Sequence, residues 1–436
     1  MKDQALKIVH RLKKQGFEAL FAGGCVRDML LQREYHDIDV ATNAPPEAVE
    51  QLFEKTLAVG KSFGVIVVVM DGEEIEVATF RQDSTGSDGR RPDSVTFCSM
   101  EDDAHRRDIT INGMFYDPIE DKIFDCVGGI EDLHAGIIRF IGNPDDRIIE
   151  DKLRMLRCVR FSARLNFKID PETLAAIKRH APEINQVSVE RIADEFLKIL
   201  RTGNYRIALN LLFETGLIDY VMPELRALEK CEQPLDYHPE NFVLEHVIKA
   251  LEALPDSASD ELRMGVLLHD IGKPATQTFE DRIRFNGHDL KGKDISREIL
   301  TRMRFSNEFI ERVLSLVENH MKFMHVFDMR TSRLKRFLAL PHFEEHLALH
   351  RVDCLASHGG LEGYDFCVEK LKTFEPEEIH PPKIVTGKHL IDMGFKPGPK
   401  FREILTDIED KQLEGSLTGQ EKALEYIKET YSAEVA

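Results

Sequence analysis

The chain has 436 residues, of which 42% are hydrophobic and 31% charged, and its formal net charge is −19. This composition is ordinary for a soluble globular protein with room for two or more domains, and it excludes the disordered and fibrous classes. So negative a net charge also argues against non-specific binding of nucleic acid over the whole surface.

The sequence carries no membrane or export signal. Its longest apolar run, "VIVVVM", is far shorter than the roughly 20 residues that span a bilayer. The first seventeen residues predict an amphipathic helix without the apolar core of a secretory signal. The seven cysteines are scattered and form no C-x-x-C pair, which indicates neither a disulfide framework nor a zinc finger. We therefore expect a cytoplasmic protein with no membrane partner.

The predicted elements change character along the chain. Apolar alternation predicts strands in the first 100 residues, at 19–24, 37–42, 64–72, 73–80 and 93–97, with a helix at 45–55. After about residue 140 the apolar spacing becomes helical, with helices at 149–165, 171–181, 189–201 and 205–217. We expect an α+β protein in which an N-terminal α/β head precedes an all-helical body. Residues 225–241, with two prolines and no periodicity, predict a seam inside that body.

One stretch of the helical body reverses the overall charge. Basic residues dominate its beginning, at Lys152, Arg154, Arg157, Arg160, Arg164 and Lys168. We expect a polyanion to bind there.

Two aspartates mark the predicted strand at 37–42. Asp37 and Asp39 flank Ile38, so on a strand their side chains share one face while Ile38 points to the core. Two neighbouring carboxylates repel unless a cation lies between them, and Mg²⁺ typically uses one or two carboxylates together with substrate phosphates. A solvated strand end is the alternative interpretation of this pattern taken by itself.

A glycine turn precedes the aspartates. Gly23 and Gly24, followed by Arg27 and Asp28, predict a tight turn whose N–H groups approach a triphosphate closely. Further along the chain, cations and a carboxylate open a new element at Arg106, Arg107 and Asp108. Together these patterns favour a nucleoside triphosphate site that contains a metal.

The motifs of this region resemble a known family. The segments "GGCVRD", "DIDVAT", "EVATFR", "RRDITINGM", "EDKLRMLRCVRF" and "VSVERIADEFLKIL", between about residues 18 and 200, resemble the class II tRNA nucleotidyltransferases and bacterial poly(A) polymerases of the DNA polymerase beta superfamily. The resemblance implies a polymerase-beta-like nucleotidyltransferase head. It also implies a Mg²⁺-dependent enzyme that adds or repairs the 3′-terminal CCA of tRNA from CTP and ATP without a nucleic-acid template.

The resemblance assigns roles to individual residues. It makes Asp37 and Asp39 the catalytic residues and the Mg²⁺ ligands, with Glu76 either a third carboxylate or a satisfied surface residue. The predicted nucleotide-binding residues of the head are Gly23, Gly24, Arg27, Asp28, Arg106, Arg107 and Asp108.

A third group of residues predicts base selection. Glu150, Asp151 and Arg154 lie at i, i+1 and i+4, which places them on one helical face. Alone this is a common surface ion-pair pattern. In the family it looks like the amino-acid template that selects CTP and ATP, with Glu150 orienting Arg154. Arg157 and Arg160, further along, either reach phosphate or line a solvated helix face.

The specificity within the family stays open at this point. Residues 59–72 look like the tRNA enzymes rather than the poly(A) polymerases, and the loop 81–97 is typical of relatives that add the terminal A. Gly86 and Ser87 stand where CCA-adding relatives often have a tyrosine. An A-adding specialist and a poly(A) polymerase therefore remain alternatives.

A second constellation lies in the helical body. His246, the adjacent His269 and Asp270, and Asp353 resemble the four motif positions of HD metal-dependent phosphohydrolases, over residues 240–360. The resemblance implies a divalent metal, whose identity stays open. Three further residues have open roles, His288 and His320 as ligands of a second metal or as phosphate contacts, and Lys273 as an anion contact. An HD phosphohydrolase acting on RNA 3′ ends, with a head that only binds RNA, is the alternative function of another class.

These patterns divide the chain into four expected domains. They are a nucleotidyltransferase head at 1–140, a helical neck with the nucleotide-selecting and RNA-binding helices at 141–225, an HD metal-binding domain at 226–360 and a helical tail at 361–436. The expected partners are the tRNA 3′ end, CTP and ATP, and the oligomeric state stays open.

Overall fold

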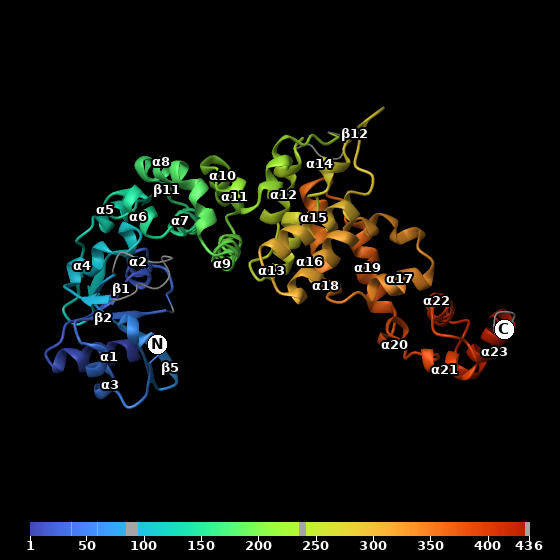
Figure 1. Ribbon diagram of the computed structural model, residues 1–436, viewed down its shortest axis with the longest axis horizontal. Coiled ribbons are helices and arrows are strands. Elements are labelled where there is room, and N and C mark those ends of the chain that lie inside the picture. The colour runs from blue at the N-terminus through green and yellow to red at the C-terminus, as the bar shows by residue number, and fades with distance from the viewer. Residues whose placement is uncertain (36, 59, 84–94, 235–240, 432–436) are drawn as a thin grey trace. The chain divides into compact units, whose positions relative to one another are not determined.

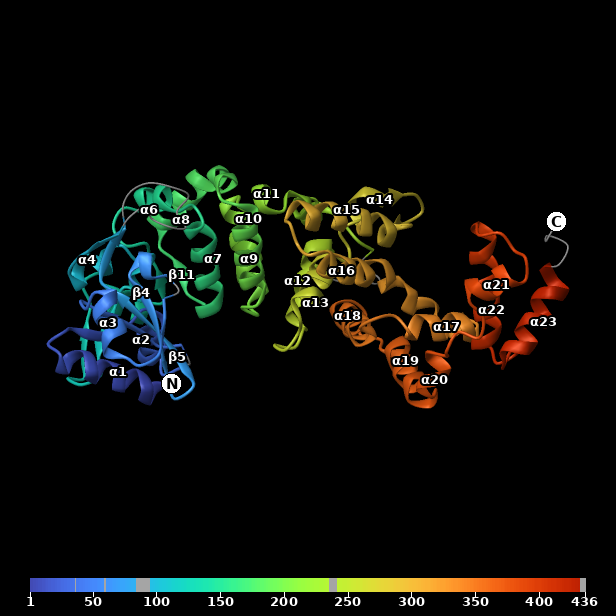
Figure 2. The same cartoon turned by 60° about the horizontal axis from the view of Figure 1, so that its bottom comes forward.

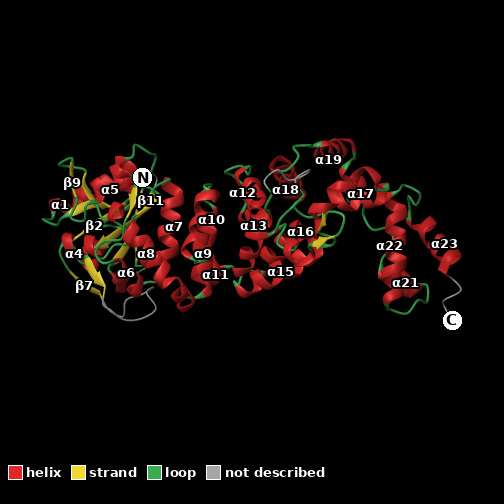
Figure 3. Cartoon of the chain, turned by 90° about the horizontal axis from the view of Figure 1, so that it is seen from above, coloured by secondary structure: helices red, strands yellow, loops and turns green. Residues whose placement is uncertain are grey.

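The computed structural model describes residues 1–35, 37–58, 60–83, 95–234 and 241–431 (Figure 1). The chain forms two compact units, one of Met1–Arg226 with Arg302–Phe305 and one of Ala227–Thr301 with Ser306–Ala436. Figure 3 shows that most strands belong to the first unit, while the second is almost entirely helical. The predicted α+β class, with a head that contains a sheet and a helical body, is confirmed.

A seven-stranded mixed sheet forms the core of the head. Its order is β3-β4-β5-β2-β1-β8-β9, and only β2 and β5 pair in parallel. The strands are β1 (Ala19–Ala22), β2 (Asp39–Thr42), β3 (Thr56–Leu57), β4 (Val65–Met70), β5 (Glu73–Thr79), β8 (Phe115–Asp117) and β9 (Lys122–Phe124). A separate pair, β6 (Arg81–Asp83) and β7 (Val95–Phe97), flanks the loop that falls outside the described residues.

The sequence patterns found every strand of four or more residues and the three-residue β7, and missed other short strands. β1, β2, β4, β5 and β7 lie within predicted segments, whereas β3, β6, β8 and β9 have no more than three residues each, too few to show alternation. One boundary differs in a way that matters for the site. β2 begins at Asp39, so Asp37 precedes the strand instead of lying inside it.

Short helices cover the sheet and supply the loops around its edge. α1 buries Ala5, Ile8, Val9 and Leu12 on one side, which is the expected amphipathic pattern. The head helices are α1 (Lys2–Lys14), α2 (Gly24–Leu30), α3 (Pro46–Leu52), α4 (Met100–His105) and α5 (Gly129–Ala135), with short 3₁₀ turns η1 (Lys61–Phe63) and η2 (Thr110–Asn112).

The continuous helix predicted at 149–165 is wrong. α6 (Pro144–Glu150) ends at Glu150, and Asp151 adopts an extended conformation with φ −150° and ψ 105°. The Asp151 carboxylate accepts a hydrogen bond from the Leu153 amide at 3.1 Å, and α7 (Arg154–Leu165) then begins. An aspartate that satisfies free backbone N–H groups at a helix start stabilises such a break.

The remaining helices of the first unit pack on α6, on α7 and on one another. α9 is strongly amphipathic and turns Phe196, Ile199 and Leu200 inward, all of them buried. These elements are α8 (Pro171–His180), η3 (Ala181–Gln186), α9 (Val189–Leu200), α10 (Tyr205–Thr215) and α11 (Ile218–Val221), with the parallel pair β10 (Ile137–Ile138) and β11 (Lys168–Ile169). The 3₁₀ segment η4 (Pro223–Lys230) contains the division between the two units.

The second unit begins with the helices that carry the HD pattern. They are α12 (Val243–Glu252), α13 (Asp260–Leu268), α14 (Lys273–Thr276), α15 (His288–Arg302), α16 (Asn307–Asn319), η5 (His320–Asp328), α17 (Thr331–Leu338) and α18 (Phe343–Ala356), with a hairpin of β12 (Thr278–Phe279) and β13 (Ile283–Arg284). Gly272 allows the closest approach, since a Cβ there would meet the His288 carbonyl oxygen at 2.1 Å. Glycine at this point therefore lets α15 start directly beside the His-Asp turn.

The end of the chain forms its own small core. Figure 2 shows α21, α22 and α23 next to one another, and buried residues such as Leu390, Ile404 and Ile427 pack between them. The elements are α19 (Glu362–Thr373), α20 (Pro376–Ile379), α21 (Gly387–Asp392), α22 (Pro399–Leu413) and α23 (Gln420–Tyr431). Among the described residues, no helix combines the length and the apolar composition needed to cross a membrane.

Candidate nucleotide site and metal centre

A cavity of about 540 Å³ opens in the first unit, where the glycine turn, the edge of the sheet and α7 meet. The strand register explains why these elements converge. Ala22 lies opposite Asp39, and Val40 lies opposite Val77, so Gly23, Asp39 and Glu76 occupy neighbouring positions at one edge of the sheet. Of the predicted residues, Asp28, Asp37 and Glu150 do not line the cavity but adjoin residues that do.

Carboxylates gather at the sheet edge of this cavity. Ile38 is buried while Asp37 and Asp39 are exposed, so the alternation expected from the sequence holds even though Asp37 precedes β2. Although Asp39 is exposed at the open cavity, the surrounding protein removes part of the hydration of its carboxyl group. This desolvation, together with the negative charges of Glu76 and Asp37, raises the pKa of Asp39 to about 6, and Arg107 opposes the shift. A carboxyl group with a raised pKa lacks a sufficient counter-charge for its ionised form. Its oxygens suit a hard cation such as Mg²⁺.

The glycine turn brings backbone close to the arginines. Gly23 has φ +74°, and a Cβ at that position would lie 3.1 Å from Nη1 of Arg107. Arg27, on α2, is 2% exposed and donates to both carboxylate oxygens of Asp28 at 2.8 Å and to the side-chain oxygen of Asn112 at 2.6 Å. Asp28 therefore fixes the guanidinium of Arg27, which itself lines the cavity.

The predicted Arg106, Arg107 and Asp108 group is held by buried acids. Both arginines bind Asp103, which is 1% exposed, with donor–acceptor distances from 2.8 to 3.2 Å. Asp108 accepts from the guanidinium of Arg157 at 2.5 and 2.9 Å. Burial alone raises the pKa of a carboxyl, but the charge and hydrogen bonds of Arg157 outweigh it and lower the pKa of Asp108 to about 2. Asp108 is thus a permanent anion that positions Arg157.

The predicted base-selecting residues meet across the helix break. Glu150 Oε2 lies 2.6 Å from Nη1 of Arg154, so the expected pair forms although the two residues belong to different helices. Arg154 also donates to the backbone oxygens of Arg147 and Arg106, at 3.0 and 3.3 Å. These contacts hold its guanidinium at the cavity wall, and within the described residues no hydrogen bond engages its Nε–H, which can donate to a ligand.

Asp151 pairs with a residue that the sequence patterns missed. Its Oδ2 accepts from Nη2 of Arg191, on α9, at 2.9 Å, and both side chains line the cavity. The shared helical face expected for Asp151 and Arg154 is therefore wrong, because the break at Asp151 redirects its side chain. Arg191 lies forty positions from Asp151 in sequence, so no helical spacing relates the two.

The ring of Phe161 packs against arginines of both α2 and α7. The guanidinium carbons of Arg27, Arg157 and Arg160 lie 5.6, 5.7 and 4.4 Å from the centre of its ring. Arg160 also pairs with Glu195, a buried residue of α9. Neither Arg157 nor Arg160 lines a solvated helix face, and both border the cavity. Arg164, from the basic stretch expected to bind a polyanion, also lines it, as do Phe161 and Asn112, which were not predicted as site residues.

Positive charge dominates the cavity despite the acidic composition of the chain. Eight arginines line it, against the acids Asp39, Glu76, Asp108 and Asp151. Asp108 and Asp151 already pair with Arg157 and Arg191. The arginines are close enough to affect one another: partial burial and the neighbouring Arg27 lower the pKa of Arg164. The arrangement suits a polyanionic ligand with a cation at the Asp39 and Glu76 edge. Residues 84–94, most of the loop expected to govern A addition, lie outside the described residues.

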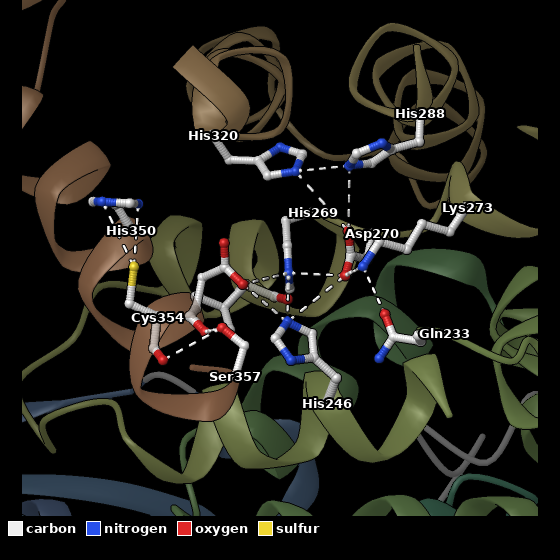
Figure 4. Close-up of polar contacts among 12 residues, drawn as sticks. Gln233, His246, His269, Asp270, Lys273, His288, His320, His350, Cys354 and Ser357 are labelled. Carbon is white, nitrogen blue, oxygen red and sulfur yellow. Dashed lines mark hydrogen bonds and ion pairs between the residues drawn. The ribbon is translucent and has the colours of Figure 1, made fainter. Parts of the chain in front are cut away.

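The second constellation forms a buried cluster in the second unit. His246 on α12, His269 and Asp270 after α13, and Asp353 on α18 converge, and His288 and His320 approach from the starts of α15 and η5 (Figure 4). The potential ligand atoms form two groups, each within 4.8 Å: His246, His269 and Asp353 in one, and Asp270, His288 and His320 in the other.

Backbone hydrogen bonds fix the orientation of three of these histidines. The Nδ1 atoms of His269, His288 and His320 lie 2.7, 2.7 and 2.6 Å from the carbonyl oxygens of Val266, Phe285 and Val317. Nδ1 therefore carries the proton, and the Nε2 lone pairs of His288 and His320 face each other at 3.1 Å. Such lone pairs repel unless a cation lies between them, and this arrangement is typical of metal-binding histidines.

Asp270 connects the two ligand groups. Its Oδ2 lies 3.3 Å from Nε2 of His269, and its Oδ1 lies 3.5 Å from Nε2 of His288. Burial raises the pKa of a carboxyl, but His269 and Lys273 outweigh it and hold the pKa of Asp270 well below its usual range. Burial and the adjacent His269 and His288 lower the pKa of His320 to about 4. A neutral histidine and an ionised aspartate are the forms that bind a divalent metal.

Comparisons with known proteins identify related domains in three parts of the chain. Family models match a poly A polymerase head domain over residues 19–139, a probable RNA and SrmB-binding site of polymerase A over 166–228, and an HD domain over 243–340. The CCA-adding enzyme of Streptococcus gordonii is 32% identical over 98% of this chain and 97% of its own length. The chain belongs to the CCA-adding enzyme family. The resemblance inferred from the motifs is confirmed.

Two further members of the CCA-adding enzyme family illustrate the range of similarity. The CCA-adding enzyme of Enterococcus faecalis is 46% identical over 51% of this chain, and the match spans about half of that relative, 55% of its length. The crystal structure of the Bacillus stearothermophilus CCA-adding enzyme in complex with CTP superposes with a TM-score of 0.76 and 29% identity, over 99% of this chain and 98% of the other.

The raised pKa of Asp39 predicts that metal binding in the head depends on pH. An acid with a pKa of about 6 is largely ionised at pH 7.5 and largely protonated at pH 5.5, so Mg²⁺ affinity should fall about fourfold between these values through Asp39 alone. Calorimetric titration of the full chain with Mg²⁺ at both pH values measures the change. Asp39→Asn should bind Mg²⁺ weakly with little pH dependence, and equal wild-type affinities at the two pH values would contradict the role of Asp39.

Proposed function

We propose that this chain is a tRNA nucleotidyltransferase that adds or repairs the 3′-terminal CCA from CTP and ATP, without a nucleic-acid template. The observation that carries the proposal is the arginine-lined cavity with Asp39 and Glu76 at its edge, in a chain of the CCA-adding enzyme family. A triphosphate needs positive charge, and the reaction at its α-phosphate needs a divalent metal.

The metal site that we propose lies at the acidic edge of the nucleotide cavity. We assign Asp37 and Asp39 as its ligands, with Glu76 beside them, because carboxylate oxygens are the hard ligands that Mg²⁺ prefers. When bound, Mg²⁺ lowers the pKa of the RNA 3′-hydroxyl and stabilises the charge on the leaving pyrophosphate. No side chain acts as a nucleophile, so the task of the protein is to hold the two substrates in line.

The arginines hold the triphosphate. Gly23 lets the chain pass close to Arg107, and Arg27 is immobilised by Asp28 and Asn112. Arg157 and Arg160 are fixed by Asp108 and Glu195. Because these guanidinium groups are anchored before the nucleotide arrives, they lose little freedom when it binds, and this preorganisation favours binding.

Arg154 and Asp151 are the residues proposed to select the base. Cytosine and adenine both present an exocyclic amine beside a ring acceptor, which matches a carboxylate beside a guanidinium. Guanine and uracil present the reverse arrangement. Glu150 orients Arg154, as expected from the sequence, and Arg191 orients Asp151.

We propose that each domain inferred from the sequence has its own part in this function. The head at 1–140 holds the metal and triphosphate, the neck at 141–225 selects the base and binds RNA, and 226–360 and 361–436 form the HD domain and the tail. The cytoplasmic location expected from the sequence stays a prediction.

Three tRNA transcripts test the proposal and its rivals. They end at the discriminator base, at C and at CC, and each is incubated with Mg²⁺ and labelled CTP or ATP before the lengths are read on a gel. Convergence of all three on one CCA end is the expected result. Growth of the CC-ending transcript alone, by one A, identifies an A-adding specialist, and long A tails identify a poly(A) polymerase.

In the same assay Asp37→Ala should abolish addition, because a metal ligand is lost. Asp3→Ala, which removes an exposed carboxylate of α1, is the matched control and should act like the wild type. Near-normal addition by the Asp37 variant would overturn the catalytic assignment.

A second candidate function is favoured by the buried histidine and aspartate cluster. We propose that it binds two divalent ions, with Asp270 between them, and hydrolyses phosphate esters at RNA 3′ ends. The observation in its favour is the pair of three-residue ligand groups that share one buried space. Metal held there supplies a hydroxide nucleophile, and Lys273, whose Nζ lies 2.7 Å from both Asp270 and Gln233, adds positive charge beside it.

Metal content and hydrolysis test this second function together. In the Asp37→Ala background, which weakens metal binding in the head, the chain should retain about two Mn²⁺ ions and open RNA that ends in a 2′,3′-cyclic phosphate. Asp270→Asn should lose both properties, while Asp289→Asn, on α15 but outside the cluster, should keep them. Two bound ions without hydrolysis would show a structural metal centre and would reject the hydrolase.

A further inference from the structure

A second cavity, of about 590 Å³, lies in the second unit among η5, α17, the segment 379–383 and α22. Its walls are joined by ion pairs. Arg336 on α17 donates to Glu409 at 2.7 Å and to the Thr406 carbonyl oxygen at 3.1 Å, both on α22. Ser332 adds a hydrogen bond to Glu414 at 3.0 Å. The cavity is therefore held open by contacts between its walls, and none of its lining residues belongs to the histidine and aspartate cluster.

Positive charge lines this cavity in excess. Lys322, Arg333, Arg336, His380 and Lys383 face Glu409 as the only acid among the described lining residues. Arg336 neutralises Glu409 directly. Within the described residues, Lys322, Arg333 and Lys383 make no side-chain hydrogen bond or ion pair. Three cations therefore surround one hollow without a counter-ion from the protein, on a chain whose net charge is −19.

Lys322 is the most informative of these cations because it is half-buried. The nearest acid along the chain, Glu318, is engaged by Lys293 at 2.8 Å. Partial burial and the nearby Arg333 lower the pKa of Lys322, although Glu318 opposes the shift. A half-buried ammonium without an acceptor is unfavourable, and an anion in the cavity would relieve it.

Part of the cavity lining is apolar and is here called the floor, while its cationic residues are called the rim. Met329, Leu340, Pro381 and Leu413 line it beside the buried Phe337. An inorganic anion would use only the cationic rim, whereas a nucleoside phosphate would use both parts, with its base on the apolar floor and its phosphate on the lysines and Arg333. The volume also exceeds what a single phosphate group fills and resembles that of the nucleotide cavity in the head, about 540 Å³.

We propose that this cavity is a second binding site for a phosphorylated nucleoside, remote from the catalytic residues. Lys322, Arg333 and Lys383 bind the phosphate, and the apolar floor receives the base. The same chemistry is offered by a free nucleotide and by one nucleotide of an RNA chain, and competition distinguishes these sources.

Photolabelling of the full chain tests the proposal. The protein is irradiated with 8-azido-ATP, and the labelled peptides are identified by mass spectrometry. We expect labelled peptides from 322–340 or 379–383 in addition to those of the head. The double variant Arg333→Glu and Lys383→Glu should lower labelling of these peptides by about tenfold or more, because two charge-assisted contacts are reversed. Labelling of the head should not change.

Arg282→Glu is the matched control. Arg282 is exposed on the turn between β12 and β13 and lies outside the cavity, so its charge reversal should leave both sites labelled. Competition by AMP at the concentration that saturates the site supports a free nucleotide, and competition by a tRNA transcript alone supports a nucleotide of RNA. Labelling confined to the head, labelling that survives the double variant, or equal competition by inorganic phosphate would overturn the proposal.

These outcomes are independent of the CCA-adding function. A wild-type chain that shows normal addition but no labelling in the second unit rejects only this site. Labelling there without any addition to tRNA rejects only the proposed reaction.

Discussion

The nucleotide cavity depends on the repulsion among its arginines and on the acids that balance it. Two cations about 6 Å apart repel by roughly 3 kcal/mol at an effective dielectric constant of about 20. Asp28, Asp103, Asp108 and Glu195 are all at most 9% exposed, and each accepts from an arginine of the cavity. These acids fix the guanidinium groups without neutralising all of them. A triphosphate completes the balance, which explains how an acidic chain presents a basic site.

The second unit also holds mutually repelling groups close together, but there they are electron-rich ligand atoms instead of cations. There the lone pairs of His288 and His320 face each other, and Asp270 lies between two ligand groups. The backbone carbonyl oxygens that accept from the histidine Nδ1 atoms prevent the rings from turning away. Both sites are therefore assembled at an electrostatic cost that the fold supports. In the functions proposed above, a triphosphate relieves this cost in the head and divalent metal relieves it in the second unit.

Local patterns in the sequence predicted much of the head. The alternation around Ile38, the glycines at 23 and 24 and the Glu150 to Arg154 spacing each act over a few residues, and the structure contains the corresponding turn, edge and ion pair. The break at Asp151 was missed because no proline or glycine marks it. Arg191 and Phe161 were missed because their contacts with Asp151 and with Arg27 join distant parts of the chain. Their geometry is a product of the packing of α7 on α9 and α2, which spacing does not encode.

The central claim is that fixed protein side chains choose the base, and Arg154 tests it most directly. The measurement compares incorporation of CTP, ATP, GTP and UTP onto a tRNA transcript by the wild type and by Arg154→Ala, at matched tRNA occupancy. The account predicts that the variant accepts GTP and UTP far more readily relative to CTP and ATP, while its affinity for tRNA changes little. An unchanged preference for CTP and ATP in an active Arg154 variant would contradict it.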